Sequence, residues 1–155
     1  MPVNARSVLG PFVATTCLQQ LRIHTEELVG RGPVLGAGRL RGQGIIVGLG
    51  LQGSRLDDDT LYRLLADTFG VEGTRLCLLT RLASDQAGGY VVQLQEGACT
   101  HLQETTEPMC AYTLGVFVGA LQAVTGVVLQ GTETECQAMG DPSCTYLIRP
   151  HPALG

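Results

Sequence analysis

The sequence predicts an α+β domain in which an antiparallel sheet packs against helices. Three observations lead to this fold class. Some segments repeat apolar residues at helical spacing, others are short strand-like runs joined by turn residues, and no repeat, low-complexity tract or linker divides the chain. A single domain covering residues 1–155 is therefore the simplest organisation, and a chain of this length can bury a core without the help of disulfides.

The composition argues against several protein classes. Charged residues make up 15% and apolar residues 45% of the chain, and the formal net charge is -4. This balance argues against disorder and against direct nucleic-acid binding. No run of apolar residues reaches the length of a membrane span, and Met1–Gly10 lacks the apolar core of a signal peptide, so we expect a cytoplasmic protein without a membrane span.

The first predicted element is an amphipathic helix from Pro11 to Val29. Its apolar positions recur at helical spacing, proline is well suited to the first turn, and Gly30 can end the helix. The last helix of the chain is predicted over Cys110 to Val124, with Gly115 and Gly119 on one side.

The segment between Gly30 and Gly53 leaves two structural interpretations open. Three pairs of glycines stand four residues apart: Gly32/Gly36, Gly38/Gly42 and Gly44/Gly48. A loop is one interpretation, because each glycine disfavours a helix by about 1 kcal/mol. The other is a buried helix whose glycine face lets a second helix or a twin subunit approach closely.

A nucleotide-binding interpretation applies to the same segment. Residues 48–53 spell GxGxxG directly after Ile45-Ile46-Val47, which resembles a strand. The dinucleotide fingerprint also requires a second strand that ends in an acid about twenty residues later, and Glu72 follows the next helix almost at once. Glycine packing is therefore favoured over a dinucleotide site.

A helix is predicted to be capped by Ser54, with Asp57 three residues later, and to end at Gly70. The acids Asp57 to Asp59 suit the positive end of this helix better than they suit a cation site. The predicted strands cover Arg75 to Leu82, Tyr90 to Gln95, Val127 to Glu133 and Thr145 to Arg149. The first two are joined by a turn-rich connection at residues 84–89, as in a hairpin.

The segment from Gly131 to Cys144 carries the most informative side chains. Cys136 and Cys144 flank a Gly-Asp-Pro turn that could bring their thiols together, and Glu133 could add an oxygen ligand. Cys110 offers a fourth ligand from the start of the preceding helix. The spacing alone leaves buried, unreactive thiols as an alternative. Glu135 also competes with Glu133 for the oxygen position.

The run from Cys110 through the glycine-containing helix to Glu133, Cys136, Cys144 and Tyr146 resembles the C-terminal half of 4-vinyl reductase domains. These domains are relatives of the TRAPP trafficking-subunit fold. In the similar effector-sensing domains of phenol- and xylene-responsive regulators, a zinc is held by a cysteine at a helix start, then Glu-x-x-Cys and a final cysteine. The resemblance therefore implies a zinc bound by Cys110, Glu133, Cys136 and Cys144. Four protein ligands leave no open position, so the expected role is structural.

The resemblance also implies a function. We expect a stand-alone domain that binds or senses a small hydrophobic molecule, forms a homodimer and signals through a partner protein. Three alternatives are an accessory role in tetrapyrrole or bacteriochlorophyll biosynthesis, a TRAPP-like interaction scaffold, and a redox sensor with a Cys136–Cys144 disulfide. An enzyme is less expected, because His24, His101 and His151 accompany no recognisable nucleophile.

The remaining cysteines and two arginines receive simpler interpretations. Cys17, Cys77 and Cys99 are predicted to pack as small apolar side chains. Arg39 and Arg41 stand between glycines, where they could contact an anionic ligand or partner, although solvated charge is the simpler expectation.

Overall fold

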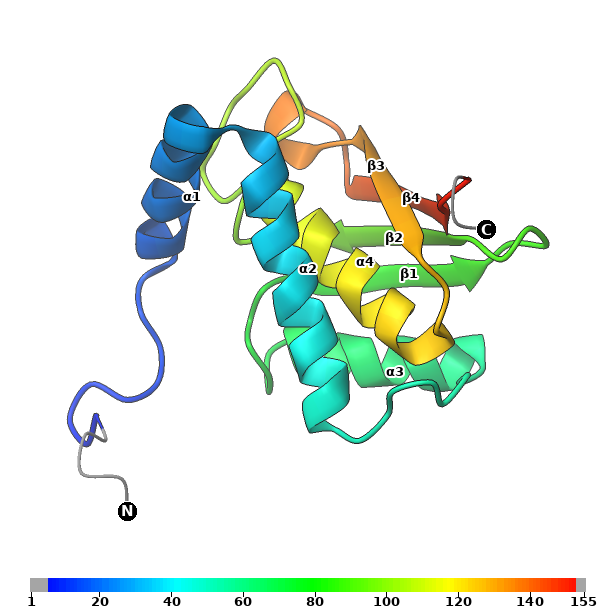
Figure 1. Ribbon diagram of the computed structural model, residues 1–155. Coiled ribbons are helices and arrows are strands. Elements are labelled where there is room, and N and C mark those ends of the chain that lie inside the picture. The colour runs from blue at the N-terminus through cyan, green and yellow to red at the C-terminus, as the bar shows by residue number, and fades with distance from the viewer. Residues whose placement is uncertain (1–5, 153–155) are drawn as a thin grey trace.

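The computed structural model describes residues 6–152, which form helices and one antiparallel sheet (Figure 1). The predicted α+β class is confirmed. The sheet has the strand order β1-β2-β4-β3, so the first hairpin pairs with the last strand of the chain. In chain order the elements are α1 (Thr15–Val29), α2 (Arg31–Gly48), α3 (Asp58–Phe69), β1 (Leu78–Ser84), β2 (Tyr90–Gln95), α4 (Ala111–Thr125), β3 (Leu129–Glu135), a short 3-10 helix (Gln137–Met139) and β4 (Cys144–Pro150).

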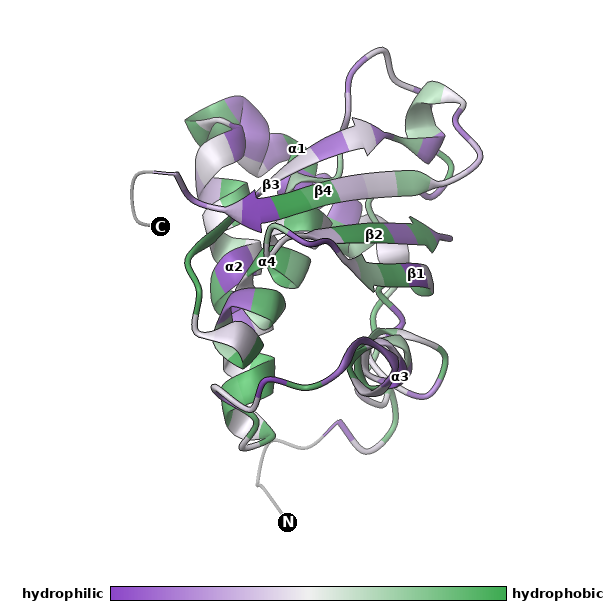
Figure 2. Cartoon of the chain, turned by 90° about the vertical axis from the view of Figure 1, so that its right-hand side faces the viewer, coloured by the Kyte–Doolittle hydropathy of each residue, from purple (hydrophilic) through white to green (hydrophobic). Residues whose placement is uncertain are grey.

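Helix α4 lies between α2 and the sheet (Figure 2). Its sequence is apolar almost all the way round, as expected of a helix with neighbours on several sides, and twelve of its fifteen residues are buried. Phe117 contacts Phe69 of α3, with ring centroids 5.1 Å apart, and also lies near Tyr146 of β4. The core is therefore built around α4, and α3 closes it beside β1.

The glycine-rich segment is a helix, α2, and not a loop. Its glycines allow α2 to pack directly against the backbone of α4. A Cβ atom on Gly38 would lie 2.1 Å from the carbonyl oxygen of Tyr112, and one on Gly42 would lie 1.9 Å from that of Val116. Reciprocally, a Cβ on Gly115 or Gly119 of α4 would meet the α2 backbone at 2.1 Å and 2.0 Å. The two helices thus touch backbone to backbone, and this close packing offsets the low helix propensity of glycine.

The dinucleotide interpretation is wrong. Ile45 to Val47 lie in the last turns of α2 rather than in a strand, and Gly48 is the final residue of that helix. A GxGxxG motif needs a strand before it and a helix after it to cradle a pyrophosphate. Here Gly50 and Gly53, with φ of +70° and +68°, shape the turn that leads to α3.

The first helix differs from its prediction in extent and in environment. It begins at Thr15 instead of Pro11, and Phe12 lies before it, stacked under the guanidinium of Arg75 at 4.9 Å. The buried side chains of α1 are Gln19 and Arg22, whereas Leu21 and Leu28 are 68% and 83% exposed. Leu18 packs against the core, whereas Leu21 and Leu28 point away from it.

Several local predictions can be compared with the structure. Asp57, and not Ser54, is the N-cap of α3, so the predicted cap is three residues too early. Asp57 accepts a hydrogen bond from the Thr60 N–H at 3.0 Å, which confirms that the acids mark the start of the helix. Cys77 and Cys99 are buried as predicted. The packing prediction is wrong for Cys17, because its side chain lies on the exposed face of α1. None of the helices in the described part of the chain has both the length and the hydropathy needed to cross a bilayer.

Candidate metal centre

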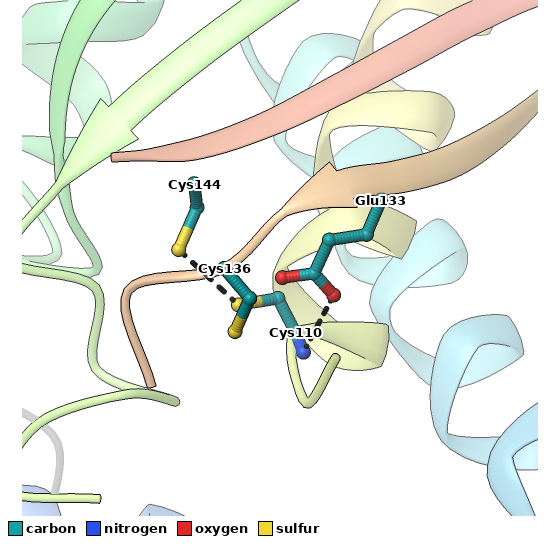
Figure 3. Close-up of side chains that lie close together, drawn as sticks. All are labelled: Cys110, Glu133, Cys136 and Cys144. Carbon is teal, nitrogen blue, oxygen red and sulfur yellow. Dashed lines mark hydrogen bonds between the residues drawn. The ribbon is translucent and has the colours of Figure 1, made fainter. Parts of the chain in front are cut away.

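Four side chains from three separate segments converge at one end of the sheet (Figure 3). Cys110 is the residue before α4, Glu133 lies on β3, Cys136 follows that strand, and Cys144 begins β4. Their potential ligand atoms all lie within 4.8 Å of one another, and all four residues are buried. The structure thus brings together the set of residues named from the sequence.

The sulfur atoms of Cys110 and Cys144 are 3.7 Å apart. Two thiolates bound to one tetrahedral zinc at about 2.3 Å would be separated by about 3.8 Å. The observed spacing therefore matches the spacing that such an ion requires. A buried cluster of three thiols and one carboxylate with this geometry could bind a metal ion.

A bulge in β3 determines which glutamate faces the thiols. Glu133 pairs with Tyr146, whereas Glu135 pairs with Thr145, so two steps on β3 correspond to one step on β4. In a regular strand both glutamates would point to the same face, because side chains alternate with a period of two. The bulge separates them, and Glu133 alone joins the cluster.

Only one of the two carboxylate oxygens of Glu133 accepts hydrogen bonds from the described residues. Its Oε2 atom accepts from the Cys110 N–H at 3.1 Å and from Arg31 Nη2 at 3.4 Å. Its Oε1 atom is buried and has no hydrogen-bond partner among the described residues. A buried carboxylate oxygen without a partner is costly, and a bound cation would satisfy it.

Arg31 is a contact that the sequence did not indicate. It is the first residue of α2, 102 positions from Glu133, and its Nη1 donates to the Pro108 carbonyl oxygen at 2.7 Å. An arginine after a glycine carries no pattern that points to a distant carboxylate. Only the packing of α2 along α4 brings this charge to the centre.

Hydrogen bonds from backbone N–H groups to side chains shape the connection between Cys136 and Cys144. The Cys136 N–H donates to Asp141 Oδ2 at 2.8 Å, and the Gln137 N–H donates to Cys144 Sγ at 3.4 Å. Gly140 has φ of +98°, a conformation that favours glycine. The Gly-Asp-Pro turn thus returns the chain so that the second thiol faces the first.

The protonation of the cluster follows from its burial and close contacts. Burial raises the pKa of Glu133 to about 7. A hydrogen bond from the Cys110 thiol lowers the pKa of Cys136, and the same contact, with that of Cys144, raises the pKa of Cys110. In the metal-free cluster Cys110 therefore holds a proton, and a bound metal ion would have to displace it.

The C-terminal part of the chain matches a known protein family. Residues 96–150 match the 4-vinyl reductase domain family. The resemblance to that family is thereby confirmed for the segment that contains all four cluster residues. A 48-residue stretch of the chain is also 38% identical to an uncharacterized protein of Methanocaldococcus jannaschii; it covers 30% of this chain and about a fifth (21%) of the length of that relative.

Several solved structures share the fold over most of the chain. The phenol-responsive sensory domain of the transcription activator PoxR, solved with phenol, superposes with a TM-score of 0.71 at 19% identity, over 90% of this chain and 76% of that one. A vinyl-4-reductase family protein from Methanocaldococcus jannaschii gives 0.62 at 14% identity, over 92% and 85% of the two chains. A trafficking protein particle complex subunit 3 from Naegleria fowleri, covalently bound to palmitic acid, gives 0.57 at 17% identity, over 91% and 97%.

Proposed function

We propose that this chain is a small-molecule-binding sensing domain of the 4-vinyl reductase type whose C-terminal strands are fixed to α4 by a structural zinc ion. The observation that carries the proposal is the convergence of Cys110, Glu133, Cys136 and Cys144 within 4.8 Å. Zinc suits three thiolates and one carboxylate better than magnesium or calcium, which prefer oxygen ligands. Four protein ligands fill a tetrahedral zinc and leave no position for water, so the proposed ion stabilises the fold and takes no part in catalysis.

The proposed zinc would connect α4, β3 and β4 at one end of the sheet. Cys110 anchors the start of α4, and the other three ligands come from β3, β4 and the turn between them. Because these segments are separated in sequence, binding one ion restricts all of them in the folded state only. Loss of the ion would loosen the β3–β4 hairpin relative to α4.

Ligand binding is supported by the fold and by a cavity. The PoxR domain of the same fold was solved with phenol, which shows what a relative can hold. This chain has an open cavity of about 690 Å³ beside α2 and α4. That volume lies within the range of about 300–1,000 Å³ that is usual for small-molecule sites.

We further propose that the chain forms a homodimer through α2. Gly36, Leu40 and Val47 lie along one face of this helix, opposite the face that contacts α4, and Leu40 is 71% exposed. Exposed apolar side chains beside small residues are typical of interfaces.

We also propose a cytoplasmic location, which agrees with the free thiols of the described residues. Signalling through a partner protein is a further part of the proposal.

The experiment is native mass spectrometry of the purified chain under reducing conditions. We expect one zinc ion per chain, and we expect Cys144→Ser to lose it, whereas Cys77→Ser, which changes a buried thiol outside the cluster, keeps it. In a parallel sample prepared without reductant, metal-free protein with a mass two hydrogens lower would instead favour a disulfide sensor. The Cys110 and Cys144 sulfur atoms lie 3.7 Å apart and the Cys136 sulfur is also within 4.8 Å, so Cys144 could pair with Cys110 as well as with Cys136.

A further inference from the structure

The cavity beside α2 has walls from four parts of the chain. The segment Pro11–Thr15 forms one wall, α2 and α4 form two more, and residues 73–76 after α3 form the last. Its apolar lining includes Ile45, Phe69, Leu76 and Val116. These side chains offer a surface suited to the apolar body of a ligand.

The charges that line this cavity are of one sign. Arg41 of α2 and Arg75 are its charged residues, and no acidic side chain lines it. This is unusual in a chain with a formal net charge of -4. The two arginines make the cavity a local positive site on an acidic protein.

The first arginine is free to bind an anion. Within residues 6–152 no hydrogen bond or ion pair engages Arg41. The Tyr112 hydroxyl lies near it in the same cavity wall; burial raises the pKa of Tyr112, and the positive charge of Arg41 partly opposes that shift. A guanidinium and a phenol O–H together present donors suited to a carboxylate.

The second arginine is held in place by its neighbours. Arg75 Nε donates to the Val71 carbonyl oxygen at 3.0 Å, and its guanidinium lies 4.9 Å from the ring centroid of Phe12. Its two terminal Nη atoms make no hydrogen bond to residues 6–152. A fixed guanidinium with free donors loses little side-chain entropy when an anion binds.

We propose that this cavity binds an amphipathic carboxylate, with the carboxylate at Arg41 beside Tyr112 and the alkyl or aryl body against Ile45, Phe69, Leu76 and Val116. Arg75 adds a second positive charge to the same cavity. The inference rests on the proposed small-molecule function and narrows it from hydrophobic molecules in general to anions with an apolar body. A second hollow of about 820 Å³ beside α1 is lined by four glutamates and by Arg22, which is paired with Glu26, so its excess of negative charge disfavours the same ligand.

The test compares dodecanoate with the neutral dodecan-1-ol by titration calorimetry of the zinc-loaded chain. We expect dodecanoate to bind at least about tenfold more tightly than dodecan-1-ol, because a charge-assisted hydrogen bond to a guanidinium contributes at least this factor. Arg41→Gln should weaken dodecanoate binding about tenfold and leave dodecan-1-ol binding unchanged. Arg63→Gln, which removes an exposed positive charge on α3 outside the cavity, should leave both unchanged.

The site of binding is checked separately. The chain has no tryptophan, so Ala14→Trp places a single fluorophore in the cavity wall, and its emission should shift when dodecanoate binds. Equal affinities for the two probes, or an unchanged dodecanoate affinity in Arg41→Gln, would overturn the anion inference and leave a hydrophobic-ligand function standing. Binding by calorimetry without a shift in emission would also overturn it. A chain that binds neither probe would contradict the proposed ligand function together with this inference.

Discussion

Glu133 shows how one side chain can be prepared for a metal ion by the residues around it. Arg31 and the Cys110 N–H hold one carboxylate oxygen, while the other is buried without a partner among the described residues. An outer contact of this kind orients a ligand before the ion arrives, and such contacts contribute strongly to metal affinity. Arg31 also offsets part of the negative charge that the Glu133 carboxylate places in a buried site.

The choice between the two glutamates gives a prediction at this scale. Glu133→Gln keeps the size of the side chain but removes its negative charge, so we expect zinc affinity to fall at least about tenfold. Glu135→Gln is the matched control, because Glu135 lies two residues away on the same strand but outside the cluster. Competition with a chromophoric chelator measures both. Equal losses in the two variants would contradict the assignment of Glu133.

The sequence could name the four cluster residues, but it could not decide between Glu133 and Glu135. Both glutamates precede a cysteine and both lie on β3. The decision depends on a one-residue bulge, which is set by how β3 and β4 pair and not by the residues of β3 alone. Arg31 was missed for a related reason, because its position depends on the packing of α2 against α4.

At the scale of elements, α2 is the case where tertiary contact overrides local propensity. Its glycines left helix and loop equally open in the sequence. The backbone contacts of Gly38 and Gly42 with α4 decide the matter, and these contacts require the partner glycines Gly115 and Gly119. By contrast α3, α4 and β2 could be predicted, since their apolar patterns, caps and turns are local signals.

The helix–helix contact yields a second prediction. Gly42→Ala would place a methyl group 1.9 Å from the Val116 carbonyl oxygen, so α2 must move away from α4. The lost packing exceeds the gain in helix propensity, and we expect a net loss of about 1–2 kcal/mol in the free energy of unfolding.

Gly44→Ala is the control for this substitution, because a Cβ at Gly44 meets nothing within 4 Å. The same methyl group there should stabilise the helix by about 0.5–1 kcal/mol. Urea unfolding followed by circular dichroism compares the two variants. Similar effects at both positions would show that α2 and α4 do not pack as closely as described.

The apolar pattern of the first helix did not predict which of its side chains are buried. Apolar spacing in residues 11–29 indicated a face that packs on the domain, yet Leu21 and Leu28 are exposed in the single chain. A pattern identifies an apolar face but not the surface that covers it. The error at Pro11 has a local cause, because Phe12 instead packs against Arg75 beside the cavity.

At the scale of the whole molecule, the exposed face of α2 predicts an assembly. Leu40→Glu places a charge at the centre of the proposed interface, so we expect it to convert a dimer to a monomer without unfolding the chain. Val71→Glu is the control, since Val71 is similarly exposed, at 62%, but lies after α3 away from α2. Light scattering after size-exclusion chromatography measures the mass. A monomeric wild-type chain at micromolar concentration would contradict the dimer proposal.

The uninterrupted length of α2 has a mechanical consequence. Arg31 at its first turn contacts Glu133, Arg41 lines the cavity, and Leu40 points to the opposite side. Since a helix moves as a stiff rod, a small rotation about its long axis would displace these three positions together. The close backbone contacts of Gly38 and Gly42 with α4 would set the limit of such a rotation, because there is no space between the two helices for a side chain.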